Sequence, residues 1–121
     1  MINKALYSKK SDNWATPKEY NFWQTWDPCP LNSKIDGLNI KWHGKILLNP
    51  PFSKQRLFVE KAIKEIPNCE RLELLLPART DTKLFHELLY NKFPIIFIKG
   101  RIKFGGGTTS APFPSMLIKL K

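Results

Sequence analysis

The sequence has few cysteines, few acidic residues and no long apolar run. The two cysteines among its 121 residues, Cys29 and Cys69, do not have the spacing of a metal site. No stretch approaches the roughly 20 consecutive apolar residues of a membrane-spanning helix, and the basic N-terminal segment has no apolar core typical of a signal peptide. We therefore expect no metal site, no membrane association, and reduced thiols in the cytoplasm.

Acidic residues are half as numerous as basic ones. Twenty Lys and Arg against ten Asp and Glu give a formal net charge of +10. An excess of this size favours a polyanionic partner, with nucleic acid ahead of an anionic membrane surface. Charge alone does not distinguish such a partner from a lysine-rich solvated surface, so the motifs must decide.

The length and composition are those of one globular domain. The chain has 42% hydrophobic and 25% charged residues, which is typical of a folded protein. We expect a single compact domain over residues 1–121. Residues 1–13 are polar and show no useful periodicity, and we expect them to form a flexible segment.

Short apolar runs alternate with amphipathic segments, which predicts an α/β fold with parallel crossovers. Thr16, Pro17 and Glu19 are suited to the N-cap, N1 and N3 positions of an earlier helix. The other expected elements are strands at 45–48, 72–76, 95–98 and 115–120, and helices at 53–66 and 82–91.

The sharpest chemical motif is Asn49-Pro50-Pro51-Phe52, which follows the expected strand 45–48. The carboxyl ends of strands are where open α/β sheets bind ligands. An aromatic exocyclic amine is a poor nucleophile because its lone pair is delocalised into the ring. An amide oxygen and a backbone carbonyl that each accept one N–H would expose that lone pair, and consecutive prolines leave carbonyls outside sheet pairing.

An aromatic side chain directly after the prolines can stack on a flipped base. A strand-ending turn explains the same four residues, Asn49 to Phe52, equally well. The two interpretations are evenly balanced on these residues and their flanking elements alone.

Several further blocks, in their order and spacing, resemble the phage-type DNA N6-adenine methyltransferase family. The resemblance covers roughly residues 13–120. Its blocks are Trp14-Ala15-Thr16-Pro17, Asp27-Pro28-Cys29-Pro30, Asp36-Gly37-Leu38, Trp42-His43-Gly44, Asn49-Pro50-Pro51-Phe52-Ser53, Leu76-Pro77-Ala78-Arg79-Thr80-Asp81-Thr82, Phe85-His86, Gly100-Arg101-Ile102-Lys103-Phe104 and Ala111-Pro112-Phe113-Pro114-Ser115-Met116-Leu117.

The resemblance implies transfer of a methyl group from S-adenosylmethionine to adenine N6 in DNA, by a phage- or prophage-encoded protein in a bacterial cytoplasm. It implies a reduced Rossmann-like methyltransferase core, a mostly parallel sheet whose C-terminal strand lies antiparallel beside 72–76. The implied catalytic residues are Asn49, Pro50, Pro51 and Phe52, and the implied cofactor-binding residues are Trp14, Thr16, Pro17, Asp27, Pro28, Asp36 and Leu38. For Asp36 a structural Asp-Gly turn is an equal alternative.

Basic residues close to the expected strand ends and the catalytic loop are candidates for DNA contacts. For each of them an ordinary solvated surface position is the alternative. These candidates are Lys54, Arg56, Arg79, Arg101 and Lys103. Those that follow strands, Arg79, Arg101 and Lys103, are candidates for DNA phosphates or for the carboxylate of the cofactor.

The segment that should hold the adenosine of the cofactor is short. Only residues 28–44, 17 in number, separate Asp27 from Lys45, and no Gly-x-Gly turn follows Asp27. One crossover unit alone needs about ten residues or more. We therefore expect a shortened half-sheet, an incompletely enclosed adenosine that a homodimer would close, and no separate target-recognition domain.

Two alternatives stay open at this point. One is a shortened, weak or inactive relic that binds DNA or regulates another protein without turnover. The other is a related methyltransferase that acts on RNA adenine or on a protein glutamine amide.

Overall fold

Four strands form a single sheet in the computed structural model, which describes residues 15–29, 36–106 and 110–121. The expectations for residues 1–13 and for Trp14 lie outside these residues. The strands are β1 (Gly44–Leu48), β2 (Cys69–Pro77), β3 (Ile95–Phe97) and β4 (Ser115–Lys119), and their spatial order is β1-β2-β4-β3. The expectation of a single domain over the whole chain stays a prediction.

The sheet is mixed rather than mostly parallel. β1 and β2 are parallel, whereas β4 is antiparallel to both of its neighbours, β2 and β3. Three strands therefore point the same way, but only one of the three pairings is parallel. The α/β class and the antiparallel closing strand beside β2 are confirmed. The expectation of a mostly parallel sheet was wrong. Because β4 lies between β2 and β3, two antiparallel pairings take the place of one parallel pairing.

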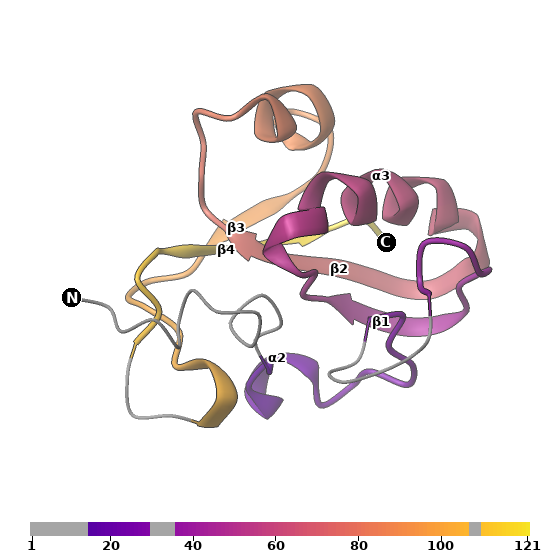
Figure 1. Ribbon diagram of the computed structural model, residues 1–121, viewed down its shortest axis with the longest axis horizontal. Coiled ribbons are helices and arrows are strands. Elements are labelled where there is room, and N and C mark those ends of the chain that lie inside the picture. Colours follow the sequence, from indigo (N-terminus) through magenta and orange to yellow (C-terminus); the bar gives the residue numbers. More distant parts are fainter. Residues whose placement is uncertain (1–14, 30–35, 107–109) are drawn as a thin grey trace.

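Helices cover the two faces of the sheet unequally (Figure 1). The long helix α3 (Gln55–Glu65), flanked by the 3-10 turns η2 (Phe52–Lys54) and η3 (Ile66–Asn68), lies on one face, and α2 (Lys18–Asn21) lies on the other. The central strand β2 is buried on both faces from Leu72 onward, which explains its three consecutive leucines, Leu74–Leu76. The α3 face holds the larger core, and the α2 face holds a smaller cluster of Leu47, Leu75 and Ile102.

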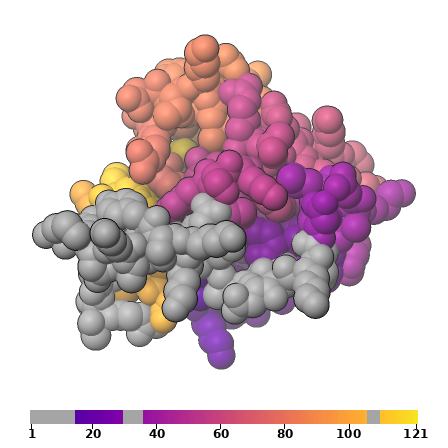
Figure 2. All heavy atoms as spheres, in the orientation of Figure 1, coloured from indigo at the N-terminus to yellow at the C-terminus, as the bar shows by residue number. Residues whose placement is uncertain are grey.

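Two of the expected helices differ from the sequence-based expectation. The helix expected over 82–91 is a short π-helical turn, η4 (Phe85–Leu89), which forms a rounded lobe beside α3 (Figure 2). Asn91, with φ 62°, lies in the left-handed region and turns the chain just after it. The N-terminal helix α2 is a single turn with Pro17 at its N-cap and no side-chain cap, so the capping role expected of Thr16 was wrong.

A buried carboxylate ties the end of α3 to the segment before β1. Glu65 accepts hydrogen bonds from the backbone N–H of Trp42 (2.7 Å), from Lys61 (2.9 Å) and from Asn68 (3.2 Å). Burial by itself raises the pKa of Glu65, but these three donors together lower it to about 2. The Trp42 indole in turn donates to the carbonyl of Gly37 (2.8 Å). The approach to β1 is therefore anchored by one charged side chain.

We expect Glu65→Gln to lower the free energy of unfolding by about 1–3 kcal/mol at pH 7, because a buried charge-assisted network loses its charge. The folded pKa of about 2 lies below the ordinary value of 4.5. The contribution of Glu65 is therefore fully present above pH 4.5 and is lost as the pH falls toward 2. Urea denaturation over this pH range measures both effects.

The matched control is Glu60→Gln, a half-exposed residue of the same helix paired with Arg56, which should change stability by less than about 0.5 kcal/mol. Equal losses in the two variants would contradict the anchoring role.

Candidate active site

The loops that carry the predicted site meet at one edge of the sheet. This edge contains the carboxyl ends of β1, β2 and β3 and the start of the antiparallel β4. Hydrogen bonds join neighbouring loops there: Ala78 N–H donates to the carbonyl of Pro114 (2.8 Å), and Ile98 N–H donates to that of Ser115 (3.0 Å). The Asn49–Phe52 motif after β1, which the sequence analysis predicts to be catalytic, therefore lies where open α/β sheets bind ligands.

Asn49 is held at two points by residues distant in the sequence. Its side-chain Nδ2 donates to the hydroxyl of Thr16 (3.1 Å), which is 33 residues away. Its backbone carbonyl accepts a hydrogen bond from the thiol of Cys29 (3.6 Å), 20 residues away. Both the plane of the amide and the path of the loop are therefore fixed by tertiary contacts. Thr16, expected to contact the cofactor, contacts Asn49.

Phe52, at the end of the Asn49–Phe52 motif, packs in a row of aromatic rings with Phe113 and Phe104, which we call the aromatic chain. Pro50 and Pro51 are buried, whereas Phe52 keeps 38% of its surface exposed. The Phe52 ring meets Phe113 edge-on at 5.5 Å between centroids, and Phe113 lies 6.2 Å from Phe104. Phe113 and Phe104 were not among the candidate site residues. The signal that could have found Phe113 is its position between two prolines in one of the family-like blocks.

Asp27, Pro28 and Cys29 form the second part of the site. The N–H of Cys29 donates to Oδ1 of Asp27 (2.8 Å). Burial raises the pKa of the half-buried Asp27 carboxyl, while this backbone hydrogen bond opposes the rise. Burial and the nearby Asp27 raise the pKa of Cys29 to about 12, so its thiol stays protonated and can donate to Asn49. Both cysteines are free thiols.

A close backbone approach joins Pro28 to the Asp36-Gly37-Leu38 block. A Cβ atom at Gly37 would lie 2.0 Å from the carbonyl oxygen of Pro28, so only glycine fits there. Asp36 is exposed, and its two carboxylate oxygens accept from the backbone N–H of Leu38 (3.1 Å) and the side-chain amide of Asn39. These local bonds favour the structural-turn interpretation of Asp36. Leu38 is partly buried against the main core.

The predicted DNA-contacting residues lie in different electrostatic surroundings. Arg56 forms ion pairs with Glu60 (3.4 Å) and Glu87 (2.7 Å) on the α3 side of the molecule. Arg101 donates to the carbonyl of Ala111 (3.4 Å) beside the aromatic chain. Lys54, Arg79 and Lys103 are exposed. DNA contact by all five stays a prediction.

Ser115 is a polar residue of this edge that the sequence analysis did not single out. Its hydroxyl is buried and has no hydrogen-bond partner among the described residues, at the first position of β4 opposite Pro77. A buried, unpaired hydroxyl destabilises the folded state. A polar atom of a bound ligand at this edge would remove that cost.

Over 15–29, 36–106 and 110–121, no group of three His, Cys, Asp or Glu side chains could hold a metal ion. No helix within these ranges is long and apolar enough to cross a membrane.

The chain is thus an α/β protein with an Asn-Pro-Pro-Phe loop at the carboxyl edge of its sheet, and comparison with known proteins specifies the family. Residues 30–115 match the DNA N-6-adenine-methyltransferase (Dam) family, and the chain belongs to it. This confirms the resemblance drawn from the sequence.

Among curated proteins, the chain is similar to the DNA N-6-adenine-methyltransferase of Escherichia phage T1, with 39% identity over 62 residues. The match covers 49% of this chain and 26% of the relative, so the chain matches about a quarter of the length of that relative. No solved structure matches the chain significantly.

We expect Asp27→Asn to raise the melting temperature of the ligand-free protein by about 2–4 °C at pH 7. Asparagine keeps the acceptor for Cys29 N–H but removes a carboxylate whose pKa burial raises above 3.8. A raised folded pKa means that ionised Asp27 destabilises the fold at high pH, and that this cost vanishes below the unfolded pKa. The gain should therefore disappear below pH 3.8. Thermal unfolding against pH measures it, with the exposed Asp36→Asn as control, and a lower melting temperature for Asp27→Asn would contradict the assignment.

Proposed function

We propose that this chain transfers a methyl group from S-adenosylmethionine to the N6 amine of adenine in DNA, on a reduced Rossmann-like methyltransferase core. The observation that carries the proposal is the doubly held Asn49, followed by two buried prolines and the half-exposed Phe52. Membership of the DNA N-6-adenine-methyltransferase family supports the substrate. The three strands of common direction, with α3 crossing between β1 and β2, support the core.

The polar groups around Asn49 fit the amino-acid end of S-adenosylmethionine. The half-buried Asp27 carboxylate lacks a compensating cation among the described ion pairs, and a bound ammonium group would supply one. Asp27 and Pro17 would hold this end, whereas Thr16 acts through Asn49. S-adenosylmethionine, when bound, supplies an electrophilic methyl group. Pro28, Asp36 and Leu38 stay predictions for the adenosine end. Asp36 would then bind in addition to closing its own turn.

Asn49 and Pro50 orient the target amine. The Oδ1 atom of Asn49 accepts one N6–H, and the carbonyl of Pro50 accepts the other. These two bonds draw the nitrogen toward tetrahedral geometry and expose its lone pair. Thr16 holds the Asn49 amide and Cys29 holds its backbone, so the acceptors are in place before the base arrives. Such positioning, rather than a strong base, lowers the barrier of a direct transfer.

Phe52 supplies the stacking surface for the flipped adenine. Its ring is partly exposed and is held from one edge by Phe113. Stacking on an aromatic side chain is worth about 1–3 kcal/mol per base. The buried prolines on the other side of the loop limit its movement.

We expect Asn49→Ala to lower single-turnover methyl transfer to adenine in duplex DNA by about 100-fold or more, because an acceptor acting on the reacting amine is lost. Binding of DNA and thermal stability should stay close to wild type, and Lys64→Gln, at the far end of α3, is the control. Labelled-methyl transfer to DNA, RNA and protein, measured in parallel, separates the substrate classes. Asn49→Ala activity within a few-fold of wild type would contradict the catalytic assignment, and wild type without transfer would support the inactive-relic alternative.

Thr16 allows a test of positioning against cofactor binding. Thr16→Val keeps the shape but removes the acceptor for Asn49 Nδ2, so kcat should fall about tenfold, the equivalent of one hydrogen bond. The KM for S-adenosylmethionine should change little, and Thr16→Ser should restore kcat. A raised KM with unchanged kcat would instead show that Thr16 holds the cofactor, as the family resemblance implies.

The homodimer and the bacterial cytoplasmic location are further parts of the proposal. A homodimer would close the adenosine end, since residues 36–43 contain no helix or strand that could do so. Free thiols at Cys29 and Cys69 suit a reducing compartment.

A further inference from the structure

All acidic residues lie in the first 87 residues of the sequence. None occurs after Glu87, whereas the last 34 residues, 88–121, carry six basic side chains. On the α3 side, by contrast, Glu60 and Glu87 surround Arg56. The basic side chains of the acid-free part are Lys92, Lys99, Arg101, Lys103, Lys119 and Lys121.

Three of these cations lie on a firmly held segment between β3 and β4, which we call the basic loop (Lys99–Lys103). The loop is joined to its surroundings by hydrogen bonds from Ile98 N–H to Ser115 (3.0 Å) and from Ala111 N–H to Ile102 (2.8 Å). Ile102 is only 4% exposed and packs into the smaller core with Leu47 and Leu75. Ile102 is thus buried, whereas its neighbours Arg101 and Lys103 are exposed.

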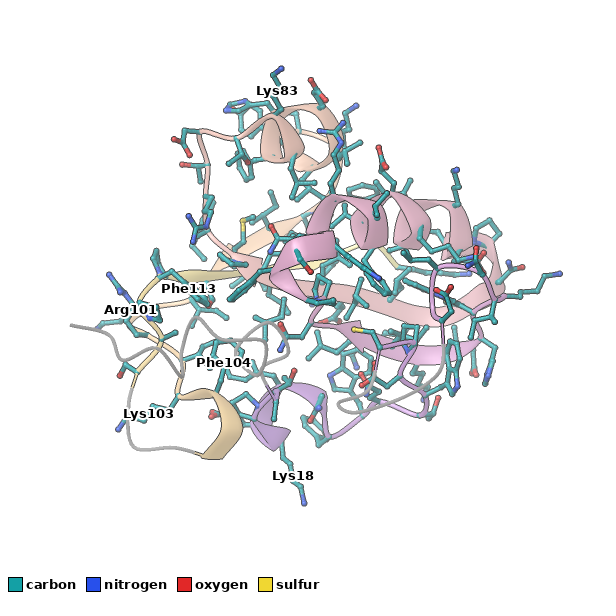
Figure 3. All side chains as sticks on the ribbon, viewed as in Figure 1. Lys18, Lys83, Arg101, Lys103, Phe104 and Phe113 are labelled. Carbon is teal, nitrogen blue, oxygen red and sulfur yellow. The ribbon has the colours of Figure 1, made fainter. Side chains whose placement is uncertain are left out.

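The aromatic chain connects the basic loop to the proposed base-stacking ring. Phe104 follows Lys103 directly and lies 6.2 Å from Phe113, which lies 5.5 Å from Phe52. Figure 3 shows Arg101 and Lys103 at the outer side of this region, with Lys83 far away on the lobe beside α3. A nucleotide stacked on Phe52 would thus have its neighbouring phosphates within reach of the loop.

The helix α3 offers a poorer surface for phosphates. Arg56 already pairs with Glu60 and Glu87, so a phosphate would have to displace two carboxylates. Glu87 would also repel a nearby phosphate. Of the predicted DNA contacts, Arg56 is therefore the least suited.

We propose that the phosphates flanking the flipped adenine lie along Lys99, Arg101 and Lys103, and that the DNA does not follow α3. Lys99 is a new member of this surface. The inference rests on the proposed function only for the position of the target base, which it takes to be Phe52.

The test compares two triple variants of equal charge. Lys99→Gln/Arg101→Gln/Lys103→Gln removes the basic loop, and Lys41→Gln/Lys45→Gln/Lys64→Gln removes three exposed cations near the amino ends of the strands. Binding to an adenine-containing duplex is measured by fluorescence anisotropy at several salt concentrations. The log–log salt slope should fall by about two to three units for the basic-loop variant and by less than about one for its control.

Two additional variants test whether the change in slope comes from lost folding and whether the DNA contacts α3. Lys99→Gln/Lys103→Gln leaves the Arg101–Ala111 hydrogen bond intact and should lower the slope by about two units. Arg56→Gln should leave the slope unchanged. Equal slope changes in the two triple variants, a loss with Arg56→Gln, or preference for RNA of the same sequence would each overturn the inference.

Methyl transfer measured beside binding separates this inference from the proposed function. If wild type methylates DNA but the two triple variants bind alike, the surface is wrong and the function stands. If the slopes differ as expected and no methyl group is transferred, the DNA surface stands and the function is wrong.

Discussion

The insertion of β4 between β2 and β3 is the constraint on which the site depends. β3 joins the sheet through β4, with Ile95 opposite Ile118 and Phe97 opposite Met116. Because β4 runs against its neighbours, its first residue lies at the carboxyl ends of the other strands. The two antiparallel pairings of β4, together with the parallel pairing of β1 and β2, therefore place Phe113, the basic loop and Asn49 at the same edge.

The buried polar groups at this edge of the sheet suit the proposed chemistry more than they stabilise the fold. The thiol of Cys29 has a pKa of about 12 and so acts as a hydrogen-bond donor to Asn49. The Asp27 carboxyl is half-buried with a raised pKa, and Ser115 has no hydrogen-bond partner within the described part of the chain. Glu65, away from the edge, has three donors and a pKa of about 2. A buried unpaired hydroxyl and a carboxyl with a raised pKa are typical of sites that complete their interactions with a ligand.

Elements buried by a regular pattern were predictable from the sequence. The helix at 53–66 was found because its apolar residues recur with helical spacing, and the strands at 45–48 and 72–76 because each is a short apolar run. β2 extends further, over Cys69–Pro77, because pairing with β1 and β4 recruits residues whose own pattern is not apolar. The capping box at Thr16 failed because Asn49 provides the Thr16 hydroxyl with a distant partner instead of the helix N-terminus.

The sequence alone determined the family and most elements, and it predicts the catalytic motif, because these follow from neighbouring residues and from fixed spacing. Only the tertiary structure decided what each polar side chain contacts. Thr16 is hydrogen-bonded to Asn49, 33 residues away, and Arg56 is paired with Glu87, 31 residues away. The tertiary structure also sets Phe113 against Phe52. Local propensity and periodicity carry no information about such pairs, because contacts between distant segments depend on strand order and register, which form only when the whole sheet assembles.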